Sequence, residues 1–475
     1  MNTTAYEVLI VGGGISGLTA AWHLNRAGVH VGLLESLPTV GGCTQTHERN
    51  GFLLEKGPFN VMVRDPSFED LLSDLSDQVG VVSASSTARK RFIYRGGKLH
   101  LVPTNPVSLA TTRLLRPRSR ARLMAGMVMS KRSGDTEQTI EQAASRRFGR
   151  EVADTMISAV ISGVFAGDIR KLSANACFPA VSRIDARARS LIGYGLASAF
   201  RKKPKRPRRW RGLVSVDGGL GALTAALGKP MGPDLRTGAS VRQVRETPDG
   251  YEIDFQSSDK PTETLQCRYL IMATPAAEAG RLLGSKIADI AGTIESASLV
   301  VLNLGFRRSH VGHPLDGFGF LVPQNEPGFP LMGVLWADSI FPHHAPPDHC
   351  LIRIFIGGAR DPGAIDRTED QLLRTATTAL RGLLDISGDP VLVDFCRYRA
   401  AIPQYHLGHQ AKIEQLHRIV AQSPRLRVIG NYLEGVSLND CVRLATHTAS
   451  DLVEQIKQPS PPQPSDQRLA NAGAI

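Results

Sequence analysis

Residues 8–17 constrain the fold more than any other stretch of this chain. They read V-L-I-V-G-G-G-I-S-G, an apolar strand that runs directly into a glycine-rich turn. Gly12 permits the tight turn, Gly14 lets the backbone approach a pyrophosphate, and Gly17 lets the following helix pack closely on the strand. The unpaired N–H groups at the start of that helix then face the phosphates. The stretch therefore predicts a dinucleotide-binding strand–turn–helix unit.

An acidic residue after the next apolar run narrows the choice of dinucleotide. Residues 29–34 predict a second strand, and Glu35 ends it, 23 positions after Gly12. A carboxylate there accepts hydrogen bonds from ribose hydroxyls and repels a 2′-phosphate, which favours FAD or NAD over NADP.

Two further segments favour FAD. Residues 40–42 read V-G-G, and residues 55–58 read E-K-G-P after one more short strand. A second glycine pair lets the backbone pass close to an extended, tightly held flavin. The expected cofactor-binding residues of this region are Gly12, Gly13, Gly14, Ser16, Gly17, Glu35, Gly42, Gly57, Pro58, Phe59 and Asn60.

Length and composition indicate a globular enzyme of two or three domains. The chain has 475 residues, of which 42% are hydrophobic and 21% charged. No apolar run reaches the roughly 18 residues that a spanning helix requires. The first strand begins almost at the N-terminus, which leaves no room for a targeting segment, so we expect a cytoplasmic location. Six well-separated cysteines without a C-x-x-C pair indicate reduced thiols and no metal site.

The net charge of +12 is concentrated in two blocks. Arginines flank an apolar stretch over residues 107–129, and residues 201–211 form a cationic loop around Trp210. Basic residues beside apolar ones favour peripheral contact with an anionic membrane surface. Nucleic acid and a solvated loop without a partner are the alternatives. The apolar stretch favours the membrane, and no nucleic-acid partner is expected.

The remaining patterns outline the rest of the fold. Three- and four-residue apolar spacing predicts helix over 136–163, and a hairpin is expected at 240–255. Alternation predicts an antiparallel sheet from 299–306 and 351–356. Helices are expected at 369–384 and 438–456, and a disordered tail from 458 onward.

Several segments together resemble the protoporphyrinogen oxidase family of FAD-dependent enzymes, within the flavin amine oxidase superfamily. The opening motif at residues 12–24 is shared by many flavin amine oxidases, and the more specific segments are S-G-V-F-A-G-D-I-R-K-L-S at 162–173, A-I-P-Q-Y-H-L-G-H at 401–409 and G-N-Y-L-E-G-V-S-L-N-D-C-V at 430–442. Residues 91–99 and 317–323 also match. The resemblance runs from residue 8 to about residue 453.

The resemblance implies an α/β fold with a split Rossmann-type FAD-binding domain, an α+β substrate-binding domain and a helical membrane-contact domain. The expected boundaries are 1–85, 213–280 and 401–457 for the FAD-binding domain, 86–212 for the helical domain, 281–400 for the substrate-binding domain and 458–475 for the tail.

The resemblance also implies the activity. Family members oxidise the porphyrinogen substrate protoporphyrinogen IX to protoporphyrin IX in haem biosynthesis, removing six electrons, with oxygen as acceptor and hydrogen peroxide released. Coproporphyrinogen III, which has four propionates instead of two, is the alternative substrate, and a flavin-binding protein without turnover is a third reading. The family pattern identifies no catalytic acid or base, and it is compatible with a homodimer.

Further residues are carried over from the family. Val241 is expected to meet the adenine end of FAD through its backbone, with a strand-core role as the alternative. Val436, Ser437 and Leu438 are expected near the pyrophosphate or flavin. Arg91 suits a substrate propionate, with a solvated charge as the alternative. Phe318 and Phe320 suit stacking on a pyrrole ring, with a core position as the alternative.

Phe59 departs from the family pattern, and two histidines need a separate interpretation. Some family members carry arginine where this chain has Phe59, and Arg64 is the nearest arginine. His406 and His409 have a helical spacing, but no carboxylate or cysteine completes a metal set, so a structural role is expected for both.

Overall fold

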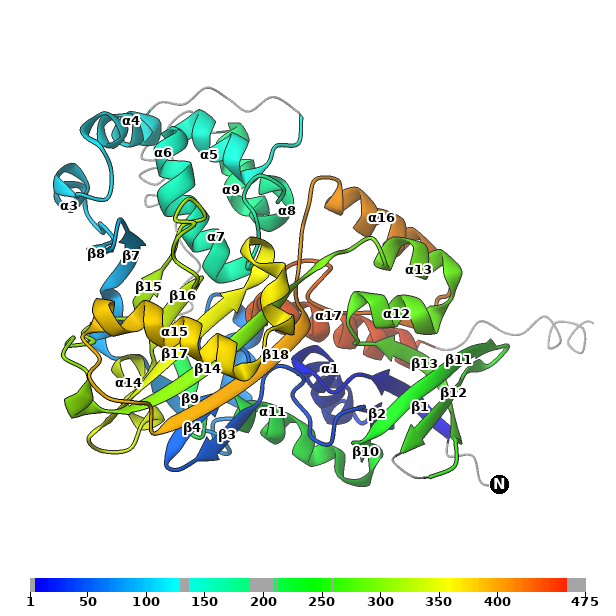
Figure 1. Cartoon of the computed structure of the whole chain (residues 1–475). Helices are drawn as coiled ribbons and strands as arrows, with labels where there is room; N and C mark the ends of the chain where they lie inside the picture. Colours follow the sequence, from blue (N-terminus) through cyan, green and yellow to red (C-terminus); the bar gives the residue numbers. More distant parts are fainter. Residues whose placement is uncertain (1–4, 129–135, 188–208, 211, 258–259, 459–475) are drawn as a thin grey trace, which may run out of the picture.

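The computed structural model describes residues 5–128, 136–187, 209–210, 212–257 and 260–458. Two seven-stranded sheets organise these residues (Figure 1). The first sheet has the order β10-β2-β1-β13-β12-β11, and β19 also pairs with β13. Its strands are β1 (Ala5–Val11), β2 (Val31–Leu34), β10 (Leu235–Arg236), β11 (Ala239–Thr247), β12 (Gly250–Ser257), β13 (Glu263–Met272) and β19 (Leu426–Val428).

Helices cover both faces of the first sheet, which explains why its central strands are apolar throughout. β1 runs parallel to β2 and β13, and its residues 8–11 are nearly inaccessible to solvent. On one face lie α1 (Ile15–Arg26), α11 (Leu220–Gly228) and α17 (Leu438–Lys457). On the other face lie α12 (Ala276–Leu283), α13 (Ser285–Ala291) and α16 (His409–Val420).

The second sheet has the order β18-β14-β17-β16-β15-β7-β8. Its strands are β7 (Arg91–Arg95), β8 (Lys98–Leu101), β14 (Ser296–Arg307), β15 (Gly319–Leu321), β16 (Gly333–Trp336), β17 (His349–Gly357) and β18 (Leu392–Pro403). α15 (Glu369–Leu384) packs its apolar residues on one face. Thr368 caps this helix by accepting from the amide of Gln371, whose side chain in turn accepts from the Thr368 amide.

Small elements connect the sheets. β3 (Thr46–Arg49) pairs with β4 (Phe52–Glu55), and a three-stranded sheet has the order β5-β9-β6, with β5 at Val61–Met62, β6 at Val81–Ser83 and β9 at Leu213–Val216. α2 (Pro66–Asp74) begins at Asp65, whose carboxylate accepts from the amide of Ser67. α14 (Ala337–Ile340) follows β16.

A helical lobe lies at one end of the molecule (Figure 1). It contains α3 (Pro106–Thr111), α4 (Pro117–Val128), α5 (Ile140–Phe148), α6 (Arg150–Val152), α7 (Ser158–Phe165), α8 (Ala174–Cys177) and α9 (Pro179–Arg187). A π-helical stretch, Ala153–Ile157, joins α6 to α7. None of the described helices is long and apolar enough to cross a bilayer.

The structure confirms several sequence predictions and corrects one. The hairpin at 240–255, the antiparallel pairing of 299–306 with 351–356, and the helix at 369–384 are all present. The helix expected over 136–163 is interrupted at Gly149, which has φ of +94° and ends α5. Glycine suits this positive φ, and a Cβ there would also lie 2.6 Å from the Arg122 side chain, which would have to shift.

The strands β7 and β8 lie within the range expected for the helical domain. They extend the second sheet instead, because residues 91–93 pair in parallel with β15. Most of the cationic loop at 201–211 and the tail from residue 459 lie outside the described residues.

Candidate functional site

The turn after β1 is built to admit a ligand. Gly12 has φ of +110°, and a Cβ on Gly17 would lie 1.9 Å from the Gly12 carbonyl oxygen, so neither residue tolerates a side chain. A Cβ on Gly14, by contrast, would have nothing within 4 Å. Gly14 is also the N-cap of α1 and provides no side chain to cap the helix. The first turn of α1 thus faces open space, which suits an anionic pyrophosphate.

Glu35 lies beside this turn at the carboxyl end of β2. Its Oε2 accepts from the Gly13 amide at 2.6 Å, and its Oε1 accepts from the Leu37 amide at 2.8 Å. The side chain is buried, and these two donors fix its orientation. Oε1 also accepts from the Ser36 hydroxyl at 3.2 Å, so Oε2 is the oxygen that keeps a lone pair for a ribose hydroxyl.

Two further glycine segments pack against the turn. The Gly41 amide donates to the Gly13 carbonyl at 2.8 Å, and a Cβ on Gly42 would lie 3.4 Å from the Gly14 Cα. A Cβ on Gly57 would lie 2.3 Å from the Cys43 carbonyl oxygen. The glycines that the sequence singled out therefore form one continuous surface from three separate segments.

Side chains around this surface indicate a hollow with polar walls. Cys43 is solvent-accessible and follows Gly41 and Gly42, and burial raises the pKa of its thiol. The Thr274 hydroxyl, after β13, is buried and has no hydrogen-bond partner among the described residues. The open Gly14, Glu35 and this hydroxyl fit the pyrophosphate and ribose of a dinucleotide.

The start of α17 approaches the same region. Ser437 caps the helix by accepting from the Asp440 amide. The Asn439 side chain accepts from the Arg64 amide at 3.0 Å and donates to the Met62 carbonyl at 3.0 Å. This brings Leu438 close to the segment that follows Asn60. Val436 instead packs against the apolar cluster at the base of the helical lobe.

Val241 lies on β11, next to a bulge in the pairing with β12. Its side chain is buried in the apolar core, as in the alternative role of a strand-core residue. Its carbonyl accepts from Arg281 Nη2 at 3.0 Å. Two residues earlier, the Ala239 amide donates to the Glu35 carbonyl at 2.8 Å. Val241 thus lies near the ribose-binding carboxylate, and an adenine at its backbone would compete with Arg281.

The two predicted substrate residues lie on the second sheet and contact each other. The Arg91 guanidinium lies over the Phe318 ring at 5.1 Å from its centroid. Arg91 is exposed and Phe318 is half-buried. Phe320, by contrast, is in the core beneath α15 and cannot stack on a ligand.

Phe59 has a packing role. Its ring lies 5.5 Å from Phe341 and 4.9 Å from His344, and only 5% of the residue is exposed. An arginine at this position would need a partner within an apolar cluster. This explains why the chain carries phenylalanine there.

His406 and His409 both lie against protein side chains. His409 stacks on Tyr405 with ring centroids 4.0 Å apart, and burial lowers the pKa of His409 to about 4. His406 lies 3.9 Å from a Glu295 carboxylate oxygen. Within the described ranges, no group of three or more His, Cys, Asp or Glu side chains is arranged to hold a metal ion.

Sequence reasoning missed a buried pair of charged residues beside the Gly57 turn. Glu55 Oε1 accepts from the Leu220 amide at 2.7 Å, at the N-terminus of α11, and Oε2 accepts from the Thr46 hydroxyl at 2.7 Å. Burial raises the pKa of Glu55 to about 7. Arg353, on β17, donates to the Glu55 carbonyl. No local pattern marks this pair, because 298 positions separate its members.

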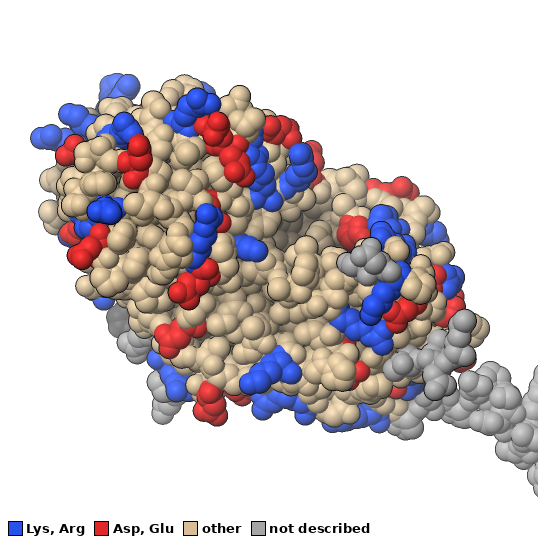
Figure 2. All heavy atoms as spheres, turned by 60° about the horizontal axis from the view of Figure 1, so that its bottom comes forward, with Lys and Arg blue, Asp and Glu red and all other residues tan. Residues whose placement is uncertain are grey.

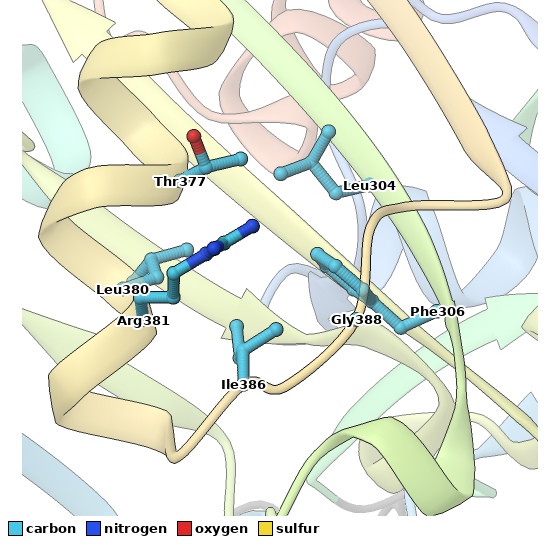
Figure 3. A pocket seen from close by; sticks show the side chains of 7 residues that line it. All are labelled: Leu304, Phe306, Thr377, Leu380, Arg381, Ile386 and Gly388. Carbon is cyan, nitrogen blue, oxygen red and sulfur yellow. The ribbon is translucent and has the colours of Figure 1, made fainter.

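The small cavity shown in Figure 3 is separate from this site. It lies between α15 and β14 and is lined by Leu304, Phe306, Thr377, Leu380, Arg381, Ile386 and Gly388. Leu304 alternates with Asn303 along β14, so it points to the face of the sheet opposite the Arg353 side chain.

Solved structures share the fold of this protein. A crystal structure from Exiguobacterium sp. 255-15, provisionally assigned as a protoporphyrinogen oxidase, superposes with a TM-score of 0.79 at 23% identity, over 96% of this chain and 100% of that chain. Reduced UDP-galactopyranose mutase superposes with a TM-score of 0.71 at 17% identity, over 95% of this chain and 94% of that chain. These similarities establish a mixed α/β fold.

The sequence assigns the family. Residues 15–453 match the model of the flavin-containing amine oxidoreductases, and the chain belongs to this family. Coproporphyrinogen III oxidase of Bacillus subtilis is 26% identical over 95% of this chain and 98% of its own length. Protoporphyrinogen oxidase of Homo sapiens is 29% identical, and that of Macaca fascicularis 30%, each over 93% of this chain and 97% of its own length. The predicted oxidoreductase class, FAD cofactor and family resemblance are confirmed.

Proposed function

We propose that the protein is an FAD-dependent porphyrinogen oxidase of haem biosynthesis that converts protoporphyrinogen IX to protoporphyrin IX. The observation that carries the proposal is the end-to-end match to relatives named for this activity, which covers 93% or more of the chain. Such coverage includes the substrate sheet and the helical lobe as well as the nucleotide turn. Removal of six electrons requires three oxygen molecules and yields three of hydrogen peroxide.

The chain's own residues bind and orient in this proposal. Bound FAD would supply hydride acceptance. The Gly12–Gly14 turn and the α1 N-terminus would hold its pyrophosphate, Glu35 its ribose, and the Val241 backbone its adenine. The rest of the FAD molecule would be enclosed by Gly42, Gly57 and the start of α17.

Substrate orientation falls to the second sheet. Arg91 would pair with one propionate through its planar guanidinium, and the Phe318 ring beneath it would contact a pyrrole. The apolar residues around Phe318 exclude water from the macrocycle. No residue is assigned as a general acid or base.

The test is an aerobic assay of the FAD-loaded protein with protoporphyrinogen IX that follows porphyrin fluorescence and oxygen uptake together. The proposal predicts three oxygen molecules consumed per porphyrin formed, above the rate without protein. Porphyrin formation at the rate of the protein-free control would overturn it.

Coproporphyrinogen III is the second candidate substrate, because the Bacillus subtilis relative named for it covers 95% of this chain. The same assay with both porphyrinogens side by side decides between them. A higher kcat/KM for coproporphyrinogen III would assign the enzyme to that substrate.

We also infer that the protein is cytoplasmic and that its helical lobe rests on an anionic membrane surface. Large apolar side chains are exposed there: Val107 on α3 at 76%, Val128 on α4 at 51% and Val181 on α9 at 56%. Arg118 and Arg122 of α4 are exposed beside them. On the face that Figure 2 presents, positive and negative side chains are interspersed around a hollow between the lobes, which does not favour a polyanion-binding surface there.

The membrane inference has a matched control. Replacing Val107 and Val128 with Asp should reduce cosedimentation with vesicles of phosphatidylcholine and phosphatidylglycerol at least threefold. Val391, which is 45% exposed on the second-sheet side of the molecule, is the control, and Val391→Asp should leave binding unchanged. Equal vesicle binding by all three proteins would remove the inference.

The finer organisation is a proposal as well. The FAD-binding domain would comprise residues 1–85, 213–280 and 401–457, and the substrate-binding domain residues 281–400. The helical domain would lie within 86–212, apart from β7 and β8, which pair in the second sheet. A homodimer is proposed from the family resemblance, and light scattering of the purified protein at several concentrations tests it.

A further inference from the structure

A row of polar side chains crosses one face of the second sheet. In the strand register Asp394 of β18 lies opposite Asn303 of β14, and Asn303 lies opposite Arg353 of β17. Directly opposed residues share a face, so the three side chains are neighbours. The Asn303 amide donates to Asp394 Oδ2 at 3.0 Å and its Oδ1 accepts from Arg353 at 3.4 Å. The opposite face, beneath α15, is apolar.

Arg353 lies at the end of this row, and its guanidinium hydrogen-bonds to the backbone of the segment that precedes Pro58. It donates to the Glu55 carbonyl, to the Lys56 carbonyl at 3.2 Å and to the Gly57 carbonyl at 2.5 Å. Three successive carbonyls thus converge on one side chain. Arg353 is only 1% exposed, so water does not compete for these bonds.

A buried guanidinium needs compensation, because its desolvation is unfavourable. Burial lowers the pKa of Arg353, and the carboxylate of Asp394 and the ionised form of Glu55 oppose this effect. The rings of Phe59 and Phe355 lie 5.9 and 5.4 Å from the guanidinium carbon, which adds cation–π attraction. The carbonyls accept only, so the arrangement suits the charged form.

Residues 55–57 form part of the glycine surface to which the cofactor is assigned. Gly57 lies against the Cys43 backbone so closely that a Cβ would come within 2.3 Å of the Cys43 carbonyl oxygen. Cys43 follows Gly41 and Gly42, which contact the nucleotide turn. Arg353 is therefore connected to the turn after β1 through two consecutive backbone contacts.

We propose that Arg353 is a positioning residue for the flavin: it fixes the carbonyls of residues 55–57 so that the Gly57 turn presents its backbone to the cofactor, and it thereby ties the substrate sheet to the FAD site. The inference rests on the proposed placement of Gly57 at the cofactor. An apolar side chain at position 353 would suffice for packing. Positioning of the three carbonyls requires the several N–H donors of a guanidinium as well.

Arg360 provides a matched control. Like Arg353 it is an arginine near the second sheet that donates to several backbone carbonyls, including those of Pro323 at 3.3 Å and Phe329 at 2.7 Å, although it is only half-buried. Burial lowers the pKa of both arginines. Arg360 clamps the loop before β16, away from the Gly57 turn.

The experiment compares wild type with Arg353→Met, Arg353→Lys and Arg360→Met. FAD affinity of each apoprotein is measured by quenching of flavin fluorescence, with thermal unfolding of the apoprotein and the flavin midpoint potential as further readouts. Arg353→Met should bind FAD at least tenfold more weakly, and Arg360→Met should stay within twofold of wild type. Arg353→Lys should fall between, because an ammonium cannot span three carbonyls.

The outcomes separate the inference from the cofactor site itself. Equal FAD affinity and potential in Arg353→Met and Arg360→Met would reduce Arg353 to a general structural role and overturn the proposal. Should Arg353→Met fail to fold, wild-type affinity and potential in Arg353→Lys would overturn it equally. Failure of the wild type to bind FAD would contradict the site as a whole.

Discussion

The charge state of Glu55 makes the stability of the protein depend on pH in a direction that the structure fixes. Burial of this carboxyl raises its pKa from 4.5 to about 7. Because the folded-state pKa exceeds the unfolded value, Glu55 stabilises the fold when it is protonated. This contribution is fully present below about pH 4.5 and is lost as the pH rises through 7.

The magnitude follows from the shift. At roughly 1.4 kcal/mol per pKa unit, the whole contribution is about 3 kcal/mol, of which about 2.5 kcal/mol disappears between pH 5 and pH 8. Glu55→Gln removes the ionisation but keeps an acceptor for the Leu220 amide, 2.7 Å away in the wild type. The variant should therefore gain stability relative to wild type as the pH rises.

The assay is thermal unfolding of the FAD-loaded wild type and Glu55→Gln from pH 5 to pH 8. We expect the difference in midpoint to change by several degrees across this range, in favour of the variant at high pH. Asp254→Asn is a control without pH dependence: Arg245 lowers the pKa of Asp254, so this carboxyl is ionised in the folded and unfolded states throughout the range, and the difference in midpoint from wild type should stay constant. If the stability of the variant relative to wild type falls between pH 5 and pH 8, the reasoning is refuted. That result would show that the N-terminus of α11 keeps Glu55 ionised.

Three further substitutions test the remaining assignments. Gly14→Ala should leave the unfolding temperature of the apoprotein within about 2 °C of wild type but weaken FAD binding at least tenfold, because its Cβ meets no protein atom and would occupy the space for the pyrophosphate; fluorescence titration and apoprotein unfolding check both effects. Gly17→Ala should lower both the unfolding temperature of the apoprotein and its affinity for FAD, because the new Cβ would lie 1.9 Å from the Gly12 carbonyl oxygen. Arg91→Met should raise the KM for protoporphyrinogen IX roughly tenfold or more, the usual loss for a charge-assisted hydrogen bond, and leave kcat nearly unchanged in steady-state assays; an unchanged KM would return Arg91 to the role of a solvated charge.

Local patterns predicted the parts of the fold that local interactions decide. The turn after β1 is determined by backbone geometry at Gly12 and Gly17, and α15 by its apolar spacing and its capping residues. Sequence spacing therefore located both correctly. The break at Gly149 was missed because the apolar spacing from Phe148 to Val152 continues across it, whereas the positive φ of Gly149 ends α5 there.

The candidate site was predictable only where its residues lie close together in the sequence. Three glycine segments and Glu35 could be assigned to the cofactor before their contacts were known. The contact between Arg353 and the Glu55 carbonyl could not, because it joins positions 298 residues apart. The core position of Phe59 likewise depends on Phe341 and His344, which arrive from a distant segment.

Anaerobic mixing of the FAD-loaded protein with protoporphyrinogen IX tests the central claim most directly. The account predicts rapid loss of the oxidised flavin absorbance, followed on admission of air by its return and by porphyrin fluorescence. Retention of the oxidised flavin spectrum with both protoporphyrinogen IX and coproporphyrinogen III, in protein that binds FAD stoichiometrically, would contradict the assignment as a porphyrinogen oxidase.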